Sequence, residues 1–376
     1  MLSYWEQTSF TTYDFIIIGS GIVGLSTACS IAEKQADAKI LVLERGIFPS
    51  GASTKNAGFA CFAKACEMLA DLEFQSEDMV VSLAYERYVG LKKLIERLGT
   101  DAIDYQNLGG YELLFEGENS AIDDKIEYLN GILKKAFNTE VFSLRNDRIS
   151  TFGFSNIETL IYTSLEGQID TGKMMQALLA KSRLFNIQII NGALVKYLDS
   201  DGNGVFCEVQ HHFLKQSVTF KASKLAICSN AYASEFANEI DIQPGRGQVL
   251  VTEPIPNLKF KGTFHFDEGY YYFRNINNRV LFGGGRNLDF ENERTKEFEY
   301  NQLVQSELDR YLQEIILPHT HYTVAMRWAG IMGFTSNKAP VVKQVKENIV
   351  LAFSCNGMGV ALGSLSGEKA ALLLLS

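Results

Sequence analysis

The residues with the clearest chemical meaning form a glycine-rich segment near the start of the chain. Gly19, Gly21 and Gly24 stand in a G-x-G-x-x-G pattern that follows an apolar run and opens a helix-like stretch. In such a turn the first glycine permits the sharp bend, the second lets the backbone approach a pyrophosphate, and the third allows close packing of helix on strand. Ile22 and Val23 begin the helix, whose N-terminus offers N–H groups to phosphate oxygens. The segment predicts a binding site for a dinucleotide.

An acidic residue at the expected distance strengthens this interpretation. Glu44 lies about 20 residues after Gly24, at the end of the next apolar run, where an acid can bind both ribose hydroxyls. A carboxylate there repels a 2′-phosphate, which disfavours an NADP-type ligand. Arg45 follows, and then a glycine-, serine- and asparagine-rich loop, GASTKNAGF (51–59), that could run past a flavin rather than a nicotinamide. This context makes an ordinary glycine-rich turn the less favoured interpretation.

Composition excludes several other classes of protein. The chain has 376 residues, 46% of them hydrophobic and 21% charged, with a formal net charge of -9. This composition predicts a globular protein of two or three structural units and no nucleic-acid partner. The six cysteines are scattered without a C-x-x-C pair, so neither a metal site nor a disulfide framework is expected, and a cytoplasmic location fits best. No apolar stretch reaches the ~20 residues of a membrane span.

The elements that must position the glycine motif alternate between two kinds of block. A strand–turn–helix–strand unit covers residues 13–46, and helix followed by strand recurs over 171–195. Amphipathic helices are expected over 78–98 and 119–137, and a charged helix over 292–315. Strands are expected over 107–116, over 196–231 and, in several pieces, over 245–285. The pattern predicts two interleaved domains, with a substrate domain inserted between pieces of a nucleotide-binding domain.

The order of motifs resembles a known family, the glutathione-reductase-type FAD oxidoreductases of the D-amino-acid oxidase superfamily. Within it, the sequence resembles the group of γ-glutamylputrescine oxidase, glycine oxidase and sarcosine oxidase. The motifs that carry the resemblance are GSGIVGLS, LVLERG, GQIDTGKMMQALL, RGQVLV, RWAGIMGF and FSCNGMGVALG. The resemblance implies an α/β (α+β mixed) fold, in which a Rossmann FAD-binding domain (1–80, 146–235 and 320–376) is interleaved with an antiparallel-sheet substrate domain (81–145 and 236–319).

The resemblance also implies which residues contact FAD. They are Gly19, Gly21, Ile22, Val23, Gly24, Glu44, Arg45, Ser53, Thr54, Asn56, Ala57, Val195, Ser229, Asn230, Gly330, Asn356, Gly357, Met358, Gly359 and Val360. Val195 falls where a backbone contact to adenine is usual, and Ser229-Asn230 replaces a Thr-Gly pair. Sarcosine-oxidase-type members tether the flavin through a cysteine at about the position of Gly330. Because this chain has no cysteine there, we expect noncovalent FAD.

The expected catalytic residues come from two later segments. Tyr270 and Tyr272 share one face of the strand predicted over 269–274, and the first matches a substrate-facing tyrosine of the family. Two tyrosines over a flavin could cage an amine, although packing within the sheet is the alternative. Trp328 of the Trp-Ala-Gly segment and Arg274 complete the expected set. No general base is compulsory, because the cofactor supplies the difficult chemistry.

One position departs from the family pattern. Amino-acid oxidases of the family place an arginine soon after Trp-Ala-Gly to clamp the substrate carboxylate, and here that position looks like Met332. The departure predicts an amine without a clamped α-carboxylate, or one clamped elsewhere, for instance by Arg246 or Arg274.

These features together predict an enzyme that oxidises the C–N bond of a small amine or amino-acid derivative to an imine by hydride transfer to flavin N5. Electrons would then pass to oxygen or another acceptor. Two alternatives stay open: an FAD-dependent 2-hydroxy-acid dehydrogenase that oxidises C–O instead, and a non-catalytic FAD-binding assembly protein.

Overall fold

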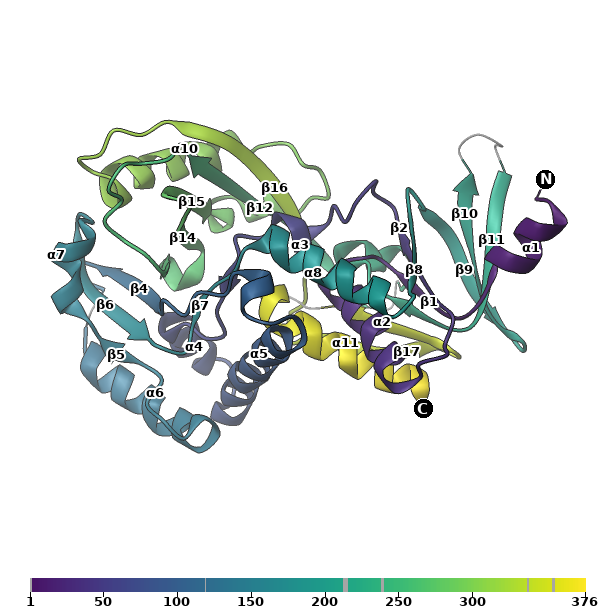
Figure 1. Ribbon diagram of the computed structural model, residues 1–376. Helices are drawn as coiled ribbons and strands as arrows, with labels where there is room; N and C mark the ends of the chain where they lie inside the picture. The colour runs from purple at the N-terminus through teal and green to yellow at the C-terminus, as the bar shows by residue number, and fades with distance from the viewer. Residues whose placement is uncertain (1, 119, 212–215, 238–239, 337, 354–355) are drawn as a thin grey trace.

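Two large β-sheets, joined by a central group of helices, make up the molecule (Figure 1). The computed structural model describes residues 2–118, 120–211, 216–237, 240–336, 338–353 and 356–376. The mixed α/β fold with two multi-strand sheets confirms the expected fold class.

The first sheet has a parallel centre, as a Rossmann arrangement requires. β1 pairs in parallel with β2 on one side and β11 on the other, so that Ile17 lies opposite both Val42 and Ala226. The apolar run of β1 is buried on both faces, which is typical of a parallel strand covered by helices. In spatial order the main path is β17 (Val341–Lys346), β18 (Ile349–Phe353), β11 (Gln216–Ile227), β1 (Thr12–Ile18), β2 (Ile40–Glu44) and β8 (Gln188–Asn191), with β10 (Gly204–His211) and β9 (Val195–Asp201) added as an antiparallel branch.

Three helices pack closely at the centre of the molecule, where α11 (Gly359–Leu375) lies between α2 (Ile22–Lys34) and α5 (Glu77–Leu98) (Figure 1). α11 is apolar over most of its circumference and is largely buried. Two of its glycines permit the close approach to α2, since a Cβ atom on Gly367 would lie 2.5 Å from Ser26 Cβ and one on Gly363 would lie 2.4 Å from Ile22 Cγ2. This packing ties the C-terminal segment to the glycine-rich turn.

The second sheet is antiparallel except for the parallel pairing of β13 with β4. Its order is β16 (Val324–Phe334), β12 (Gln243–Thr252), β15 (Arg279–Gly284), β14 (Tyr271–Ile276), β13 (Thr263–Phe266), β4 (Gly110–Phe115), β6 (Ile157–Thr163) and β5 (Ser143–Leu144). One face carries an aromatic core in which the rings of Phe264 and Phe273 stack at a centroid distance of 4.9 Å. β3 (Phe59–Ala60) and β7 (Gly167–Gln168) pair with each other in a separate two-stranded antiparallel sheet.

The remaining helices are mostly short. They are α1 (Tyr4–Phe10), α3 (Ala52–Lys55), α4 (Ala65–Leu72), α6 (Ile122–Phe137), α7 (Ile149–Phe152), α8 (Thr171–Leu184), α9 (Phe290–Glu293) and α10 (Gln302–Tyr311). The helix expected over 292–315 is instead divided: α9 ends at Glu293, and α10 begins after Asn301, whose side chain accepts a hydrogen bond from the Leu303 N–H. Within the described ranges, no helix combines the length and apolar character needed to cross a membrane.

The expected domain boundaries differ from sheet membership at two strands. β6 and β16 fall within the ranges 146–235 and 320–376, which the expected division places in the FAD-binding domain, yet both pair within the second sheet. The division into domains stays a prediction.

Candidate functional site

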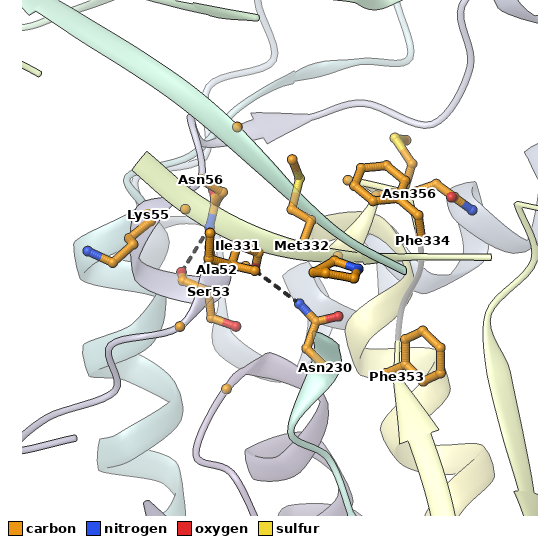
Figure 2. Close-up of a pocket in the computed structure, with 18 of the residues that line it drawn as sticks. Ala52, Ser53, Lys55, Asn56, Asn230, Ile331, Met332, Phe334, Phe353 and Asn356 are labelled. Carbon is orange, nitrogen blue, oxygen red and sulfur yellow. Dashed lines mark hydrogen bonds between the residues drawn. The ribbon is translucent and has the colours of Figure 1, made fainter. Parts of the chain in front are cut away.

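A cavity of about 840 Å³ runs from the first sheet to the second (Figure 2). At one end its wall contains Ile18, Glu44 and Cys228, at or just beyond the carboxyl ends of the parallel strands β1, β2 and β11. At the other end its wall contains Tyr270 and Tyr272 of the second sheet. Ligands of open parallel sheets bind at the carboxyl ends of the strands, and the size suits a cofactor with a small substrate.

The glycine-rich turn has the backbone geometry that its sequence predicts. Gly19 has φ +100°, a conformation that other residues rarely adopt, and a Cβ there would lie 2.8 Å from the Cys228 carbonyl oxygen. A Cβ on Gly24 would lie 1.9 Å from the Gly19 carbonyl oxygen, so this glycine lets α2 pack directly on the turn. Gly21 caps α2 and faces Ser53, whose Oγ accepts a hydrogen bond from the Ile22 N–H at 3.0 Å. The start of α2 therefore opens on the cavity.

The Glu44 carboxylate connects the glycine-rich turn after β1 with the segment after β2. Its Oε2 accepts hydrogen bonds from the Ser20 N–H (3.1 Å) and Oγ (2.7 Å), and its Oε1 accepts one from the Gly46 N–H (2.8 Å). The carboxylate is buried but still forms part of the cavity wall. Beside it the Arg45 guanidinium stacks on the Tyr232 ring at 3.6 Å from the centroid.

The loop after α3 is braced by its own asparagine. Asn56 donates from Nδ2 to the Ser53 carbonyl (2.8 Å) and accepts at Oδ1 from the Gly58 N–H (2.9 Å) and from Thr171 Oγ1 (2.9 Å). In Figure 2, Ser53 and Asn56 lie on one side and Asn356 on the other. These hydrogen bonds hold the loop in one shape at the cavity wall, and Thr171 of α8 anchors it from behind.

Two cavity-lining residues carry polar groups that lack partners within the described residues: Ser229 Oγ and Asn356 Nδ2 are buried and unpaired. Ser229 lies beside Gly19, just beyond the end of β11, and Asn356 directly precedes Gly357, Met358 and the start of α11. Buried polar atoms are normally satisfied, so these atoms await a polar ligand. Together with the glycine cradle, they fit the FAD that the sequence implies, and a helix N-terminus favours negative charge beside it.

The sequence-predicted cofactor residues are brought together almost completely. All of them line the cavity except Gly24, which packs against the turn, and Thr54, whose hydroxyl donates to the Gly51 carbonyl (3.2 Å). Asn230 also supports the second sheet, because its Oδ1 accepts from the Gly333 N–H and its Nδ2 donates to the Ile331 carbonyl (Figure 2).

The end of the cavity at the second sheet, called the substrate end because the sequence predicts the substrate there, is largely aromatic. Tyr270 and Tyr272 both line it, while the intervening Tyr271 points into the aromatic core. Burial raises the pKa of Tyr272 to about 12, so its phenol stays neutral near pH 7. The Met332 side chain lies between two glycines at this end. A Cβ atom added to Gly247 would lie 2.8 Å from Met332 Cε, and one added to Gly357 would lie 3.5 Å from Met332 Sδ. Met332 therefore fills the space between β12 and the segment before α11.

Two other expected catalytic residues lie outside the cavity wall. Trp328 donates from Nε1 to the Lys55 carbonyl at 2.9 Å, which braces the cofactor loop. Arg274 is buried behind Gly58. Burial lowers its pKa to about 10, although the negative charges of Asp170 and Asp104 act to raise it.

Arg246, the other arginine expected as a carboxylate clamp, already has a carboxylate partner. Its Nη2 and Nε lie 2.6 and 3.0 Å from the two carboxylate oxygens of Glu293, and both side chains are buried. A second Nη2 contact reaches the Asn292 carbonyl at 3.3 Å. Neither Arg246 nor Arg274 lines the cavity, so the geometry does not favour either of them as the clamp for a substrate carboxylate there.

Sequence reasoning missed the arginine that does face the substrate end. Arg286 lines the cavity, and its guanidinium stacks on Phe334 at 4.0 Å and on Phe290 at 4.9 Å from the ring centroids. A signal was present, because Arg286 directly follows a run of three glycines that ends a predicted strand. Such a run turns the chain sharply and places the next side chain off the sheet.

A second group missed from the sequence lies beside Tyr272, on the neighbouring strand β13. His265 lines the cavity, is buried, and neither ring nitrogen has a partner in the described part of the chain. Burial, with help from Lys64, holds its pKa well below the usual range, so the imidazole is neutral. Lys64 is itself paired with Glu67 at 2.8 Å.

Comparison with known proteins identifies the family. Residues 14–373 match the family model described as FAD dependent oxidoreductase. The probable oxidoreductase OrdL of Rhizobium meliloti is 23% identical over 379 residues, covering 96% of this chain and 83% of that protein. The L-2-hydroxyglutarate dehydrogenase of an Escherichia coli strain (UMN026) is 26% identical over 236 residues, covering 62% of this chain and 51% of that enzyme.

Solved structures show the same fold. The L-proline dehydrogenase from P. horikoshii superposes with a TM-score of 0.76 at 17% identity, covering 97% of this chain and 93% of that one. The glycine oxidase from Geobacillus kaustophilus superposes with a TM-score of 0.75 at 18% identity, covering 97% and 95%. At these identities the likeness extends to the fold alone.

Proposed function

The chain belongs to the family of FAD-dependent oxidoreductases, and from this premise we propose that it oxidises the C–N bond of a small amine or amino-acid derivative to an imine. It is an FAD-dependent enzyme, as the resemblance predicts. The bound FAD supplies the acceptor for the hydride that leaves the substrate carbon.

The observation that carries the proposal is the composition of the substrate end. Its described wall contains the phenols of Tyr270 and Tyr272 and the thioether of Met332. The neighbouring His265 imidazole is a weak base, because burial holds its pKa well below the usual range, and Lys64 and Glu67 are paired with each other. A neutral amine needs no base, since its own nitrogen lone pair assists departure of hydride from the adjacent carbon. The nearby Arg286 charge favours the neutral form of such an amine, because a like charge disfavours the ammonium.

The cavity wall also positions the substrate. The phenol of Tyr272 stays protonated and offers a hydrogen bond or a ring face to the amine. Its ring packs edge-on against Phe59 at a centroid distance of 5.6 Å.

A 2-hydroxy acid is the second candidate substrate, favoured by one observation. Removal of hydride from an alcohol carbon requires that the hydroxyl proton go to a base, and His265 is an imidazole in the cavity wall whose ring nitrogens have no partner among the described residues. Its lowered pKa makes it a weak base for this step, so the hydroxy acid ranks second. The name of the L-2-hydroxyglutarate dehydrogenase relative supports the same candidate.

The test is anaerobic mixing of the yellow holoenzyme with separate panels of amines, N-methyl amino acids, D-amino acids and 2-hydroxy acids while the flavin absorbance is recorded. We expect an amine or amino acid to bleach the flavin and to release ammonia or a shorter amine. Bleaching by 2-hydroxy acids alone would overturn C–N oxidation. A dithionite-reducible flavin that no metabolite bleaches would instead favour a non-catalytic assembly protein.

The mode of FAD attachment and the final electron acceptor remain predictions. Gly330 lies beside Lys55 and offers no thiol for a tether, so we expect acid precipitation to release all of the flavin into the supernatant. Oxygen or another acceptor is expected to reoxidise the enzyme. The cytoplasmic location is likewise a prediction.

A further inference from the structure

We propose that Arg286 binds a carboxylate of the substrate, which makes the substrate an amine that carries a carboxylate near the oxidised carbon. The identity of the oxidised bond rests on the proposed function, whereas the carboxylate contact does not. Arg286 would replace the carboxylate-binding arginine that amino-acid oxidases of the family place at the position of Met332.

Backbone geometry directs Arg286 into the cavity. β15 ends at Gly284, and Gly284 and Gly285 have φ values of +128° and +73°. A Cβ on Gly284 would lie 2.0 Å from the Tyr270 carbonyl oxygen, so only glycine fits this close contact between neighbouring strands. The bend takes Arg286 away from the line of the strand, and the residue sits at the cavity wall beside Tyr270 and Tyr272.

Two aromatic rings hold the guanidinium by its faces. The ring centroid of Phe334, at the end of β16, lies 4.0 Å from the guanidinium carbon of Arg286. The ring centroid of Phe290, at the start of α9, lies 4.9 Å from the same carbon. Stacking occupies the faces of the planar group and leaves its edge, where the N–H donors project. A fork of two N–H donors matches the two oxygens of a carboxylate.

The charge of Arg286 has no partner among the described side chains. No ion pair or hydrogen bond from its guanidinium to a described residue is present, whereas the neighbouring Arg246 engages Glu293 through both carboxylate oxygens. Glu293 also accepts from Gln248 Nε2 at 3.0 Å, so this carboxylate is committed elsewhere. Burial lowers the pKa of Arg286 from its usual value, but a guanidinium stays protonated near pH 7.

The surrounding wall does not neutralise this charge. Tyr270 and Tyr272 contribute phenols, and that of Tyr272 is held neutral by burial. A partly buried cation without a counter-ion is costly, and a substrate carboxylate would remove that cost on binding. The anchor would come from the β15 side of the cavity, because Met332 on β16 cannot pair with an anion.

The test is a binding titration of the oxidised holoenzyme, followed by the flavin difference spectrum, with anthranilate and anthranilamide as probes. Anthranilate is an amino carboxylate with no hydrogen on the carbon that bears nitrogen, so it binds without turnover. Anthranilamide has the same shape without the charge. We expect anthranilate to bind wild type at least about tenfold more tightly than the amide, a difference of about 1.4 kcal/mol.

Substitution of the arginine should remove this preference. Arg286→Gln should weaken anthranilate at least about tenfold and leave anthranilamide within about twofold, and Arg286→Lys should recover part of the loss. The matched control is Arg279→Gln at the opposite end of β15, where Arg279 pairs with the exposed Glu253 at 3.1 Å. That variant should bind both probes as wild type does.

Equal binding of the two probes, no spectral response to anthranilate at millimolar concentration, or unchanged anthranilate affinity in Arg286→Gln would each overturn the carboxylate contact. The titration measures no turnover, so it is independent of which bond is oxidised. An Arg286-dependent preference for anthranilate, together with bleaching by 2-hydroxy acids alone, would retain the contact and reject C–N oxidation.

Discussion

Replacement of Gly24 by alanine tests whether the glycine turn acts through close packing of α2. A Cβ at this position would lie 1.9 Å from the Gly19 carbonyl oxygen, whereas real Cβ atoms essentially never approach another heavy atom within 3.0 Å. Both atoms in the clash belong to the backbone or are fixed to it, so no side-chain rotation relieves it. Either the start of α2 or the turn must move by about 1 Å.

This movement displaces the N–H groups at the start of α2, which are expected to face the pyrophosphate. Loss of a hydrogen bond to a charged group costs about 1.5–3 kcal/mol. We therefore expect Gly24→Ala to weaken FAD binding by about two orders of magnitude, equivalent to about 2.7 kcal/mol. The measurement is the fluorescence of FAD as it is quenched on titration into apoprotein.

Gly131→Ala provides the control. Gly131 lies in α6, where an added Cβ meets nothing within 4 Å, so alanine should leave FAD affinity unchanged and stabilise the helix by up to about 1 kcal/mol. Far-UV circular dichroism of both apoproteins separates lost folding from lost binding. A folded Gly24→Ala protein that binds FAD as tightly as wild type would refute the packing argument.

Three further substitutions test the supports of the site. Glu293→Gln should lower the free energy of unfolding by about 3–5 kcal/mol, because it leaves the Arg246 charge buried without its partner; a loss below about 1 kcal/mol in urea unfolding would contradict this. Burial raises the pKa of Glu166 to about 7 from 4.5, so the folded protein binds a proton that the unfolded chain has released, and stability falls as pH rises through this window. In Glu166→Gln the free energy of unfolding should fall less between pH 4.5 and 7 than in wild type, by up to about 3 kcal/mol. The same pH dependence in both proteins would contradict this prediction. Trp328→Phe removes the hydrogen bond to Lys55 and should weaken FAD up to about fivefold with kcat nearly unchanged at saturating FAD; a large fall in kcat with normal FAD affinity would return Trp328 to a catalytic role.

Much of the fold and nearly all of the cofactor wall could be predicted from the sequence, because these features depend on local constraints. The glycine at position 19 is required by a positive φ, and the glycine at 24 by contact with a residue five positions earlier. Glu44 follows one helix and one strand later, at the spacing that a βαβ unit imposes. Such constraints lie within one supersecondary unit, so residue types and spacing reveal them.

The substrate end could be predicted in part. Alternation along a strand correctly separated Tyr272, on the cavity wall, from Tyr271, in the aromatic core. The expected helix over 292–315 was wrong because helical periodicity does not reveal where Asn301 caps a new helix.

Tertiary structure alone decided which of three arginines lines the cavity. Arg246, Arg274 and Arg286 lie on or just beyond the neighbouring strands β12, β14 and β15, and their sequence contexts look equally suitable. Arg246 is neutralised by Glu293, 47 residues away, and Arg274 is covered by the loop at Gly58. Contacts between residues so distant in sequence arise from the way the two sheets fold together, and no local pattern records them. The sequence by itself therefore determined the family, the cofactor and the shape of the turn that is expected to receive it, whereas long-range packing decided which of these three arginines lines the cavity.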